Sequence, residues 1–524
     1  MKRQSFAEGT IILIFLSFFA RFLGVFFKIP LDYLVGTQGL GLYNILYPFY
    51  TILLAVSTVG LSIAVSKMTA ERISLNRFDS AYRVFKLSSI LFMILGSLSS
   101  LCLLLLSQKI ILLLNWPPET YFGLMALTLA PFLVAIMSAF RGFFQGMGSM
   151  TPTGISMVIE QIGRILVGIG LSYFFLLKGK DLGIVVAGAA FGATAGAFLG
   201  ALFLLLYFFK NKEEIDRKVK NSFNETNIES ASAILMELLS IAVPISMGSA
   251  ISSIMVFIDS TMLPNILTKL HNSREIAIGL MGSNARALTL INVPLVISVS
   301  IGTSIVPVIA AANKSKDYNL LRVRINKGLK IGSILAIPAA VGLSMLSGEA
   351  IGTVFSSKAG EDILRILAFS VIFIVMAQIF TNILHAIGKP YIPVFTIIIG
   401  GIIKILLNSL LVSNPSLSIR GAAISTIISY MITAFLNFII VKKHTGLKLN
   451  ISSIILKPII ASALMALILP HLYSILFSLT SSLKISTVLA VVLGGGFYML
   501  LIIVLGGLTS EELKMLPIIK RNYQ

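Results

Sequence analysis

Long apolar runs recur along the whole chain, separated by short polar segments. Each run has about 18 residues or more, which is the length that an α-helix needs to cross the hydrocarbon core of a bilayer. The runs are continuous rather than alternating, which favours helices over the strands of a membrane barrel. The pattern predicts an all-α polytopic membrane protein with about fourteen spans, at approximately 9–34, 41–66, 84–106, 120–140, 154–177, 184–209, 236–263, 287–311, 330–347, 363–386, 391–412, 420–441, 453–475 and 486–507.

The composition supports this prediction. Of the 524 residues, 56% are hydrophobic and only 12% are charged, so a soluble protein could not cover so much apolar surface. The first apolar run lacks a small-residue cleavage site after a short core, and we expect it to be retained as a span. A single cysteine and four scattered histidines offer neither a disulfide framework nor the ligand spacing of a metal site, so we expect no metal and no cofactor.

The net charge of +20 has its source mainly in the segments between spans. With the N-terminus in the cytoplasm, roughly 27 lysines and arginines fall on inside segments and roughly 8 on outside segments. This bias predicts a multi-pass membrane protein with both termini in the cytoplasm. It also accounts for the charge through topology and anionic lipid headgroups, without a nucleic-acid partner.

Weak matches recur at a spacing of about 240 residues. They appear in the same order at equivalent spans: 59–63 with 301–305, Gly148 with Gly388, 164–166 with 404–406, and 188–190 with 421–423. Parallel repeats are typical of transporters in which two halves rock around a substrate site. The sequence therefore predicts an N-lobe at 1–209, a cytoplasmic linker at 210–235, a C-lobe at 236–442, and two further spans with a tail at 443–524.

Charged residues inside predicted spans are costly and need a reason, since each costs at least about 2.5–3.5 kcal/mol at the bilayer centre. In the first span, Arg21, Gly24, Lys28 and Asp32 lie on one helical face. Arg21 is predicted near mid-membrane, with Lys28 about 10 Å further out. The other intramembrane polar residues of interest are Glu160, Gln161, Arg164, Asp259, Arg286 and Lys404.

Two interpretations stay open for these residues. Glu160 and Arg164 have the i,i+4 spacing of a buried pair that would fix helix packing, and Lys28, Asp259 and Arg286 are near enough to an interface to extend toward water. Deep cations outnumber deep anions, however, so a water-filled cavity containing them would suit an anionic ligand such as phosphate. We predict Arg21, Lys28, Arg164 and Lys404 as pyrophosphate-binding residues, and as further polar or ion-coupling candidates Asp32, Glu160, Gln161, Asp259 and Arg286.

Aromatic and glycine-rich stretches have simpler interpretations. Three tyrosines at 43, 47 and 50 suit an interfacial belt. Glycines at 183, 188, 192, 196 and 200 form a small-residue ridge that permits close helix packing.

Several motifs resemble those of the stage V sporulation protein B-type exporters. They are the stretch 141–146 with 150–153 and 159–164, the stretch 36–43 after the first span, and 242–245 with 259–260. The resemblance extends over the whole chain and implies the multidrug/oligosaccharidyl-lipid/polysaccharide exporter superfamily, which includes multidrug exporters and the flippases of the lipid-linked peptidoglycan precursor.

In those flippases, cations of the first span face the pyrophosphate and the last two spans form a groove for the polyprenyl tail. Arg21 and Lys28 are the matching positions of this chain. The predicted second span has no arginine or lysine, whereas some precursor flippases carry one there. The resemblance implies a monomeric, alternating-access flippase in the bacterial cell membrane. It would move undecaprenyl-pyrophosphate-linked saccharide from the inner to the outer leaflet of the lipid bilayer, for the cell wall, a surface polysaccharide or sporulation.

Alternatives to this function remain. A cation-coupled multidrug exporter on the same fold would use membrane carboxylates, for which Asp32, Glu160 and Asp259 are the candidates. A glycan ligase or polymerase would need positioned acid and base groups, which the short outside loops lack. A non-transporting assembly factor is a third possibility. No Walker A pattern occurs, so we expect an Na⁺ or H⁺ gradient or the membrane potential, rather than ATP hydrolysis by this chain, as the energy source.

Overall fold

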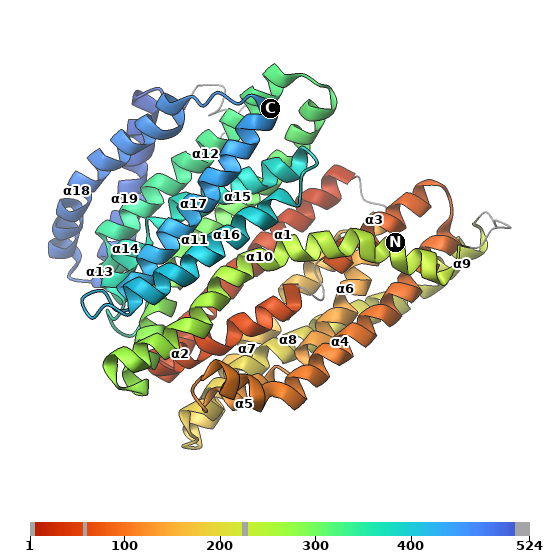
Figure 1. Ribbon diagram of the computed structural model, residues 1–524, viewed down its shortest axis with the longest axis horizontal. Helices are drawn as coiled ribbons and strands as arrows, with labels where there is room; N and C mark the ends of the chain where they lie inside the picture. The colour runs from red at the N-terminus through yellow and green to blue at the C-terminus, as the bar shows by residue number, and fades with distance from the viewer. Residues whose placement is uncertain (1–5, 56–59, 223–228, 509–524) are drawn as a thin grey trace. The chain divides into compact units, whose positions relative to one another are not determined.

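The computed structural model describes residues 6–55, 60–222 and 229–508, and these ranges contain helices and no strand. The helices are α1 (Phe6–Phe26), α2 (Lys28–Leu54), α3 (Gly60–Ser74), α4 (Phe78–Leu114), α5 (Thr120–Ala126), α6 (Ala130–Gly146), α7 (Thr151–Leu177), α8 (Leu182–Lys210), α9 (Lys212–Lys220), α10 (Ala231–His271), α11 (Arg274–Lys314), α12 (Tyr318–Met345), α13 (Ser347–Val354), α14 (Glu361–Leu367), α15 (Ser370–Ala386), α16 (Ile392–Leu407), α17 (Arg420–Thr445), α18 (Lys457–Thr480) and α19 (Leu483–Val504), with π-helical turns η2 (Asn408–Val412) and η3 (Ser452–Leu456) (Figure 1).

The all-α membrane architecture is confirmed. Within the described ranges, eleven helices are long and apolar enough to cross a membrane, or twelve if the bent pair α14–α15 forms one span. One of the eleven, Ile11–Leu54, covers the first predicted span and most of the second. Fourteen spans are consistent with this arrangement, and the full count stays a prediction.

Gly36 marks the boundary between the first two predicted spans. Its φ of 64° and ψ of −170° interrupt the helical backbone of α2, a conformation that residues with a Cβ adopt only under strain. The chain reverses here, between the predicted ends at 34 and 41. The short connection that the hydropathy pattern predicted is therefore a glycine turn within α2.

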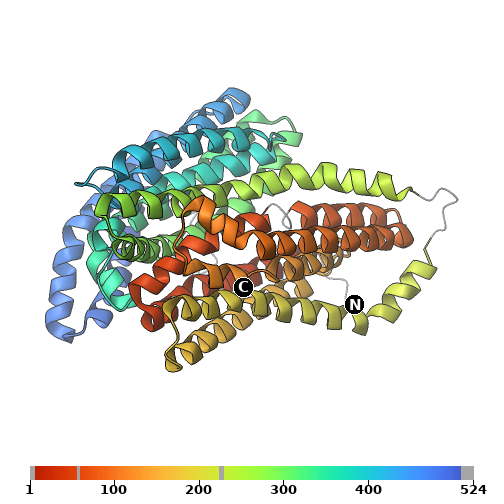
Figure 2. The same ribbon diagram turned by 60° about the horizontal axis from the view of Figure 1, so that its bottom comes forward.

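The described chain forms two compact units. The first comprises residues 1–285 with 404–418, and the second comprises 286–403 with 419–524. In the first unit, α7 packs along α8, α4 and α3 pack on α6, and α10 packs on α2 and α3 (Figure 1, Figure 2). In the second unit, α12 packs on α15 and α18, α15 on α17, and α18 on α19.

Local structure supports the sequence repeat. Helices α5 and α6 have 7 and 17 residues, and α14 and α15, about 240 residues later, also have 7 and 17 residues. Gly148 ends the first pair with φ 76°, and Gly388 ends the second with φ 79°. The same broken helix thus ends on the same left-handed glycine in each predicted lobe. The boundaries of the lobes themselves stay a prediction.

The polar segment at 210–235 is more regular than its composition suggested. The sequence predicts a linker here, and within it the structure forms α9, which buries Ile215 against the apolar core of the first unit. Acidic residues in the first turn and basic residues in the last turn of α9 suit the helix dipole. Residues 223–228 of the predicted linker lie outside the described ranges.

The glycine ridge of α8 brings this helix close to α7. A Cβ on Gly192 would lie 2.5 Å from the Arg164 carbonyl oxygen, and a Cβ on Gly196 would lie 2.3 Å from that of Glu160. Because only glycine permits such an approach, the ridge fixes the part of α7 that carries the predicted polar residues.

Candidate functional site

Close packing of α1 on α7 places the first-span charges beside those of α7. A Cβ on Gly24 would lie 3.2 Å from Gln161 Oε1, and one on Gly154 would lie 2.5 Å from Leu16 Cδ1. Ser17 donates a hydrogen bond to the Met157 sulfur over 3.4 Å. Small residues on both helices therefore hold the stripe that begins at Arg21 against the polar face of α7.

Arg164 lies at the centre of a cluster of aromatic rings. Its Nη2 donates a hydrogen bond of 2.7 Å to the Tyr43 hydroxyl, and its guanidinium carbon lies 4.4 Å from the Tyr47 ring centroid and 5.2 Å from that of Phe27. The rings of Tyr43 and Tyr47 stack with centroids 5.1 Å apart. Cation–π contacts favour a guanidinium over a bare ammonium at such a site.

Lys28 forms the second cation of this cluster. Its Nζ donates one long hydrogen bond, 3.5 Å, to Asn44 Oδ1, and it is close enough to Arg164 for the two positive charges to repel each other. Asn44 is buried. Two like charges held together inside a membrane raise the affinity of the site for an anion, since an anion relieves their repulsion.

Two polar atoms of the cluster still lack a partner. The Nε of Arg164 and the Oε1 of Gln161 are buried without a hydrogen bond to any residue that the structure describes. Unsatisfied polar atoms in a buried site cost about 1–3 kcal/mol each, and a ligand or water can remove that cost. Arg21 lies one turn before Gly24 on the same face and is exposed.

Glu160 has a different partner from the one that its spacing allowed. Its Oε2 accepts a hydrogen bond of 2.8 Å from Nη2 of Arg141 on α6, and Arg141 Nε donates to Ser156 Oγ over 2.9 Å. The interpretation of Glu160 and Arg164 as an i,i+4 pair was therefore wrong. Because Arg141 neutralises Glu160, the charge of Arg164 is not compensated by that carboxylate.

Lys404 lies in a second polar group, which contains a buried ion pair. Its Nζ is 2.8 Å from Asp259 Oδ2 on α10, and Asn408 Nδ2 donates to Asp259 Oδ1 over 2.9 Å. The Lys404 side chain is only 2% exposed and that of Asp259 10%. Both side chains are buried in this pair, so the extension of Asp259 toward water that the sequence allowed does not occur. The predicted role of Lys404 toward pyrophosphate stays a prediction.

The remaining two candidates are buried. Asp32 is fully buried in the first turns of α2 and has an interaction partner. Arg286 is also fully buried, and its Nη1 and Nη2 donate to the hydroxyls of Ser357 (2.5 Å) and Ser356 (3.1 Å) while its guanidinium lies 5.7 Å from the Phe355 ring centroid. Arg286 thus fixes the connection after α13 rather than extending to an interface.

The sequence interpretation missed the aromatic part of the cluster. Tyr43 was assigned to an interfacial belt, but it is fully buried and bonded to Arg164. The signal that could have found it is the i,i+4 spacing of Tyr43 and Tyr47, which places both hydroxyl-bearing rings on one face of α2.

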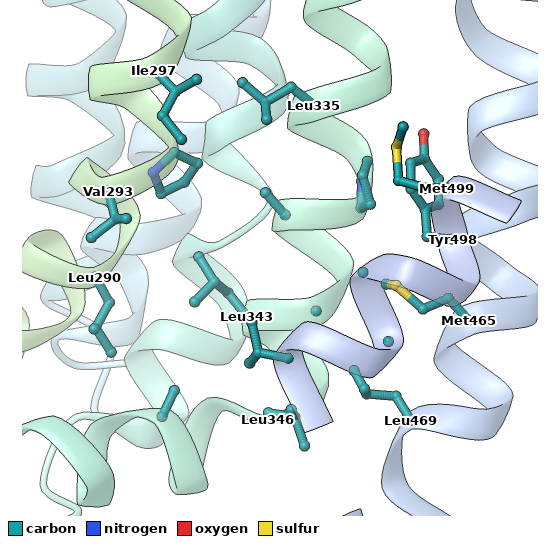
Figure 3. Close-up of a pocket in the computed structure, with 18 of the residues that line it drawn as sticks. Leu290, Val293, Ile297, Leu335, Leu343, Leu346, Met465, Leu469, Tyr498 and Met499 are labelled. Atoms are coloured by element: carbon teal, nitrogen blue, oxygen red, sulfur yellow. The ribbon is translucent and has the colours of Figure 1, made fainter. Parts of the chain in front are cut away.

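A long apolar cavity lies in the second unit, between α11 and α12 on one side and α18 and α19 on the other (Figure 3). Its volume is about 530 Å³. The lining residues are apolar or glycine except for one tyrosine, and include Leu290, Val293, Ile297, Leu335, Leu343, Met465, Leu469, Tyr498 and Met499. Such a lining accepts hydrocarbon and offers almost nothing to a polar ligand.

The apolar spans, the buried cations and the apolar cavity agree with the comparisons, which identify a protein of the multidrug/oligosaccharidyl-lipid/polysaccharide exporter superfamily. Residues 6–313 match the family model described as polysaccharide biosynthesis protein, and residues 244–410 match the MatE model. The chain belongs to the polysaccharide biosynthesis protein family. The resemblance to the stage V sporulation protein B-type exporters is confirmed.

The relatives of this chain include three proteins of Bacillus subtilis. The chain is 28% identical to the uncharacterized membrane protein YabM, over 99% of this chain and 96% of the relative. It is 29% identical to the lipid II flippase MurJ, over 84% and 83%, and 24% identical to stage V sporulation protein B, over 99% of each. The fold resembles that of an inward-facing multidrug resistance MATE family transporter, with a TM-score of 0.66 and 18% identity over 83% of this chain and 94% of that one.

Proposed function

We propose that this protein is an alternating-access flippase that moves a polyprenyl-pyrophosphate-linked saccharide from the inner to the outer leaflet of the bacterial cell membrane. The observation that carries the proposal is the cluster of Lys28 and Arg164, two positive charges that repel each other. Aromatic rings surround the Arg164 guanidinium, and its Nε has no hydrogen-bond partner among the described residues. A pyrophosphate supplies the negative charge and the acceptor oxygens that such a site lacks.

The exposed Arg21 extends this positive site along α1. We assign the first contact with the pyrophosphate to Lys28 and Arg164, with Arg21 on the approach to them. Lys404 can bind the pyrophosphate only if the ligand separates it from Asp259, because the carboxylate of Asp259 neutralises its charge.

The apolar cavity beside α18 and α19 supports the lipid half of the proposal. Its lining suits one segment of a polyprenyl chain, so the tail stays in hydrocarbon while the headgroup crosses. The relatives named as a lipid II flippase and as a probable low-salt glycan biosynthesis flippase point to the same class of substrate. The protein would carry out transport and no covalent chemistry.

The acidic residues favour this proposal over a cation-coupled drug exporter. Two of the three intramembrane carboxylates that such an exporter would use have basic partners, Glu160 with Arg141 and Asp259 with Lys404. A carboxylate that is already neutralised binds a drug cation weakly. The excess charge of the site is positive, which suits an anionic headgroup.

A binding experiment tests the proposal. Purified protein is titrated with a fluorescent polyprenyl-pyrophosphate saccharide, and Arg164→Ala and Lys28→Gln are compared with Lys109→Gln, an exposed lysine on α4 far along the chain from the cluster. Loss of one charged hydrogen bond should weaken binding about tenfold or more in the first two variants. Unchanged binding in folded Arg164→Ala would refute the cationic site.

A further inference from the structure

A furrow on the first unit is not used by the proposed transport site. It lies between α4, α6 and α8 and has a volume of about 390 Å³. Its lining is apolar except for two residues of α4, and consists of Phe85, Lys86, Ser89, Ile90, Met93, Ile136, Ala139, Phe140 and Leu205. The Phe85 and Phe140 rings, with centroids 5.2 Å apart, close its floor.

The furrow continues along α4. A second hollow of about 380 Å³ shares Met93 with the first and is lined further by Ile94, Ser97, Leu98 and Leu101. From Lys86 to Leu101 the helical rise gives about 22 Å, which exceeds the half-thickness of a hydrocarbon core of about 30 Å. Several of these side chains are well exposed, Ile90 at 52% and Leu98 at 62%. The hollow is therefore open, apolar and long enough for one extended hydrocarbon chain.

The lining of the furrow and its continuation carries a charged residue, Lys86, at one end only. Lys86 is exposed, and its Nζ lies 4.7 Å from the centroid of the Tyr82 ring. The other polar lining residues are two serines, Ser89, whose hydroxyl donates to the Phe85 carbonyl oxygen, and Ser97. Acidic groups near this end are Asp79, in the first turn of α4, and Asp216 on α9, which acts electrostatically on Tyr82. A cation and an aromatic ring at the mouth of an apolar furrow match an amphiphile with one anionic head.

We propose that this furrow binds an anionic phospholipid, with one acyl chain along α4 between Ile90 and Leu101 and the headgroup phosphate on Lys86. Two more basic residues lie toward the same end, Arg77 directly before α4 and Arg83 within it. Both add to the positive potential there. The proposal does not depend on what the protein transports. The phospholipid bound at the cationic end of α4 belongs to one leaflet and stays bound during the transport cycle.

Native mass spectrometry of the purified full-length protein tests this proposal. The probes are phosphatidylglycerol and phosphatidylcholine with identical acyl chains, titrated against the wild type, Lys86→Gln, Met93→Trp and Lys109→Gln. Lys109 is exposed near the other end of the same helix, so its variant is the matched control for loss of charge.

The wild type should bind phosphatidylglycerol more tightly than phosphatidylcholine. Lys86→Gln should lose about fivefold of the phosphatidylglycerol affinity, as about 1 kcal/mol for one lysine near anionic lipid implies, with little change for phosphatidylcholine. Met93→Trp should weaken both lipids because it fills the point that the two hollows share. Lys109→Gln should change neither.

Three results would overturn the proposal. One is equal binding of the two lipids by the wild type. Another is an equal loss in Lys86→Gln and Lys109→Gln, which would indicate a diffuse charge effect. The third is displacement of phosphatidylglycerol by a polyprenyl phosphate at lower concentration, which would assign the furrow to the transported class of lipid.

Discussion

Removing one partner of the Asp259–Lys404 pair should destabilise the protein strongly. The change is Lys404→Met, which keeps the length of the side chain and removes its charge. The two charged atoms are 2.8 Å apart and almost unexposed. At an effective dielectric constant of about 20, two unit charges at that distance attract each other by about 6 kcal/mol before the cost of desolvation. Breaking a buried pair by removing one partner costs about 3–5 kcal/mol, because the remaining charge stays buried.

A double-mutant cycle measures this effect. Lys404→Met, Asp259→Asn and the double variant are compared with the wild type by reversible unfolding in mixed micelles. Each single variant should lose about 3–5 kcal/mol in its free energy of unfolding, and the double variant should lose much less than the sum, because neither charge then remains alone. Additive losses, or a loss below about 1 kcal/mol in Lys404→Met, would refute the assignment of a tightly coupled buried pair.

Three further predictions concern packing and charge elsewhere in the chain. Arg286→Ala should lower the free energy of unfolding by about 3 kcal/mol or more, since it removes the donors that fix the connection after α13, and an unchanged melting temperature would contradict this. Gly282→Val should destabilise by about 1–3 kcal/mol, because a Cβ there would lie 1.8 Å from the Thr37 carbonyl oxygen, and a thermal melt equal to that of the wild type would refute the close crossing of α2 and α11. Arg72→Gln should cost only about 1 kcal/mol by the same assay, since its two glutamate partners are 37% and 40% exposed, and a loss above about 3 kcal/mol would show a more buried pair than the structure has.

The hydropathy pattern predicted the helices well because each apolar run must satisfy its own backbone hydrogen bonds. It could not predict how far helices continue beyond the apolar region. Each of α10 and α11 has 41 residues, about 60 Å, twice the hydrocarbon thickness. Their polar ends are held by helix capping and packing, as at Ser230, whose hydroxyl accepts a hydrogen bond from the Ala233 amide.

The candidate residues could be found from the cost of a charge in the membrane, but their partners could not. The i,i+4 spacing along one helix suggested Arg164 as the ion-pair partner of Glu160, whereas its partner is Arg141 on another helix. Lys404 and Asp259 are 145 positions apart in sequence, and only the fold brings them together. The stripe of Arg21, Gly24 and Lys28 was predictable because the helical backbone continues from α1 through Phe27 into α2.

Transport of a polyprenyl-pyrophosphate-linked saccharide across the bilayer can be measured directly. The measurement is a leaflet-accessibility assay in vesicles reconstituted with the wild-type protein, a fluorescent polyprenyl-pyrophosphate saccharide and, in parallel vesicles, a cationic dye. If the proposed function is correct, the labelled lipid becomes accessible in the opposite leaflet faster than in protein-free vesicles, with no dye efflux. Movement of the lipid at the protein-free rate while the dye is exported would contradict it.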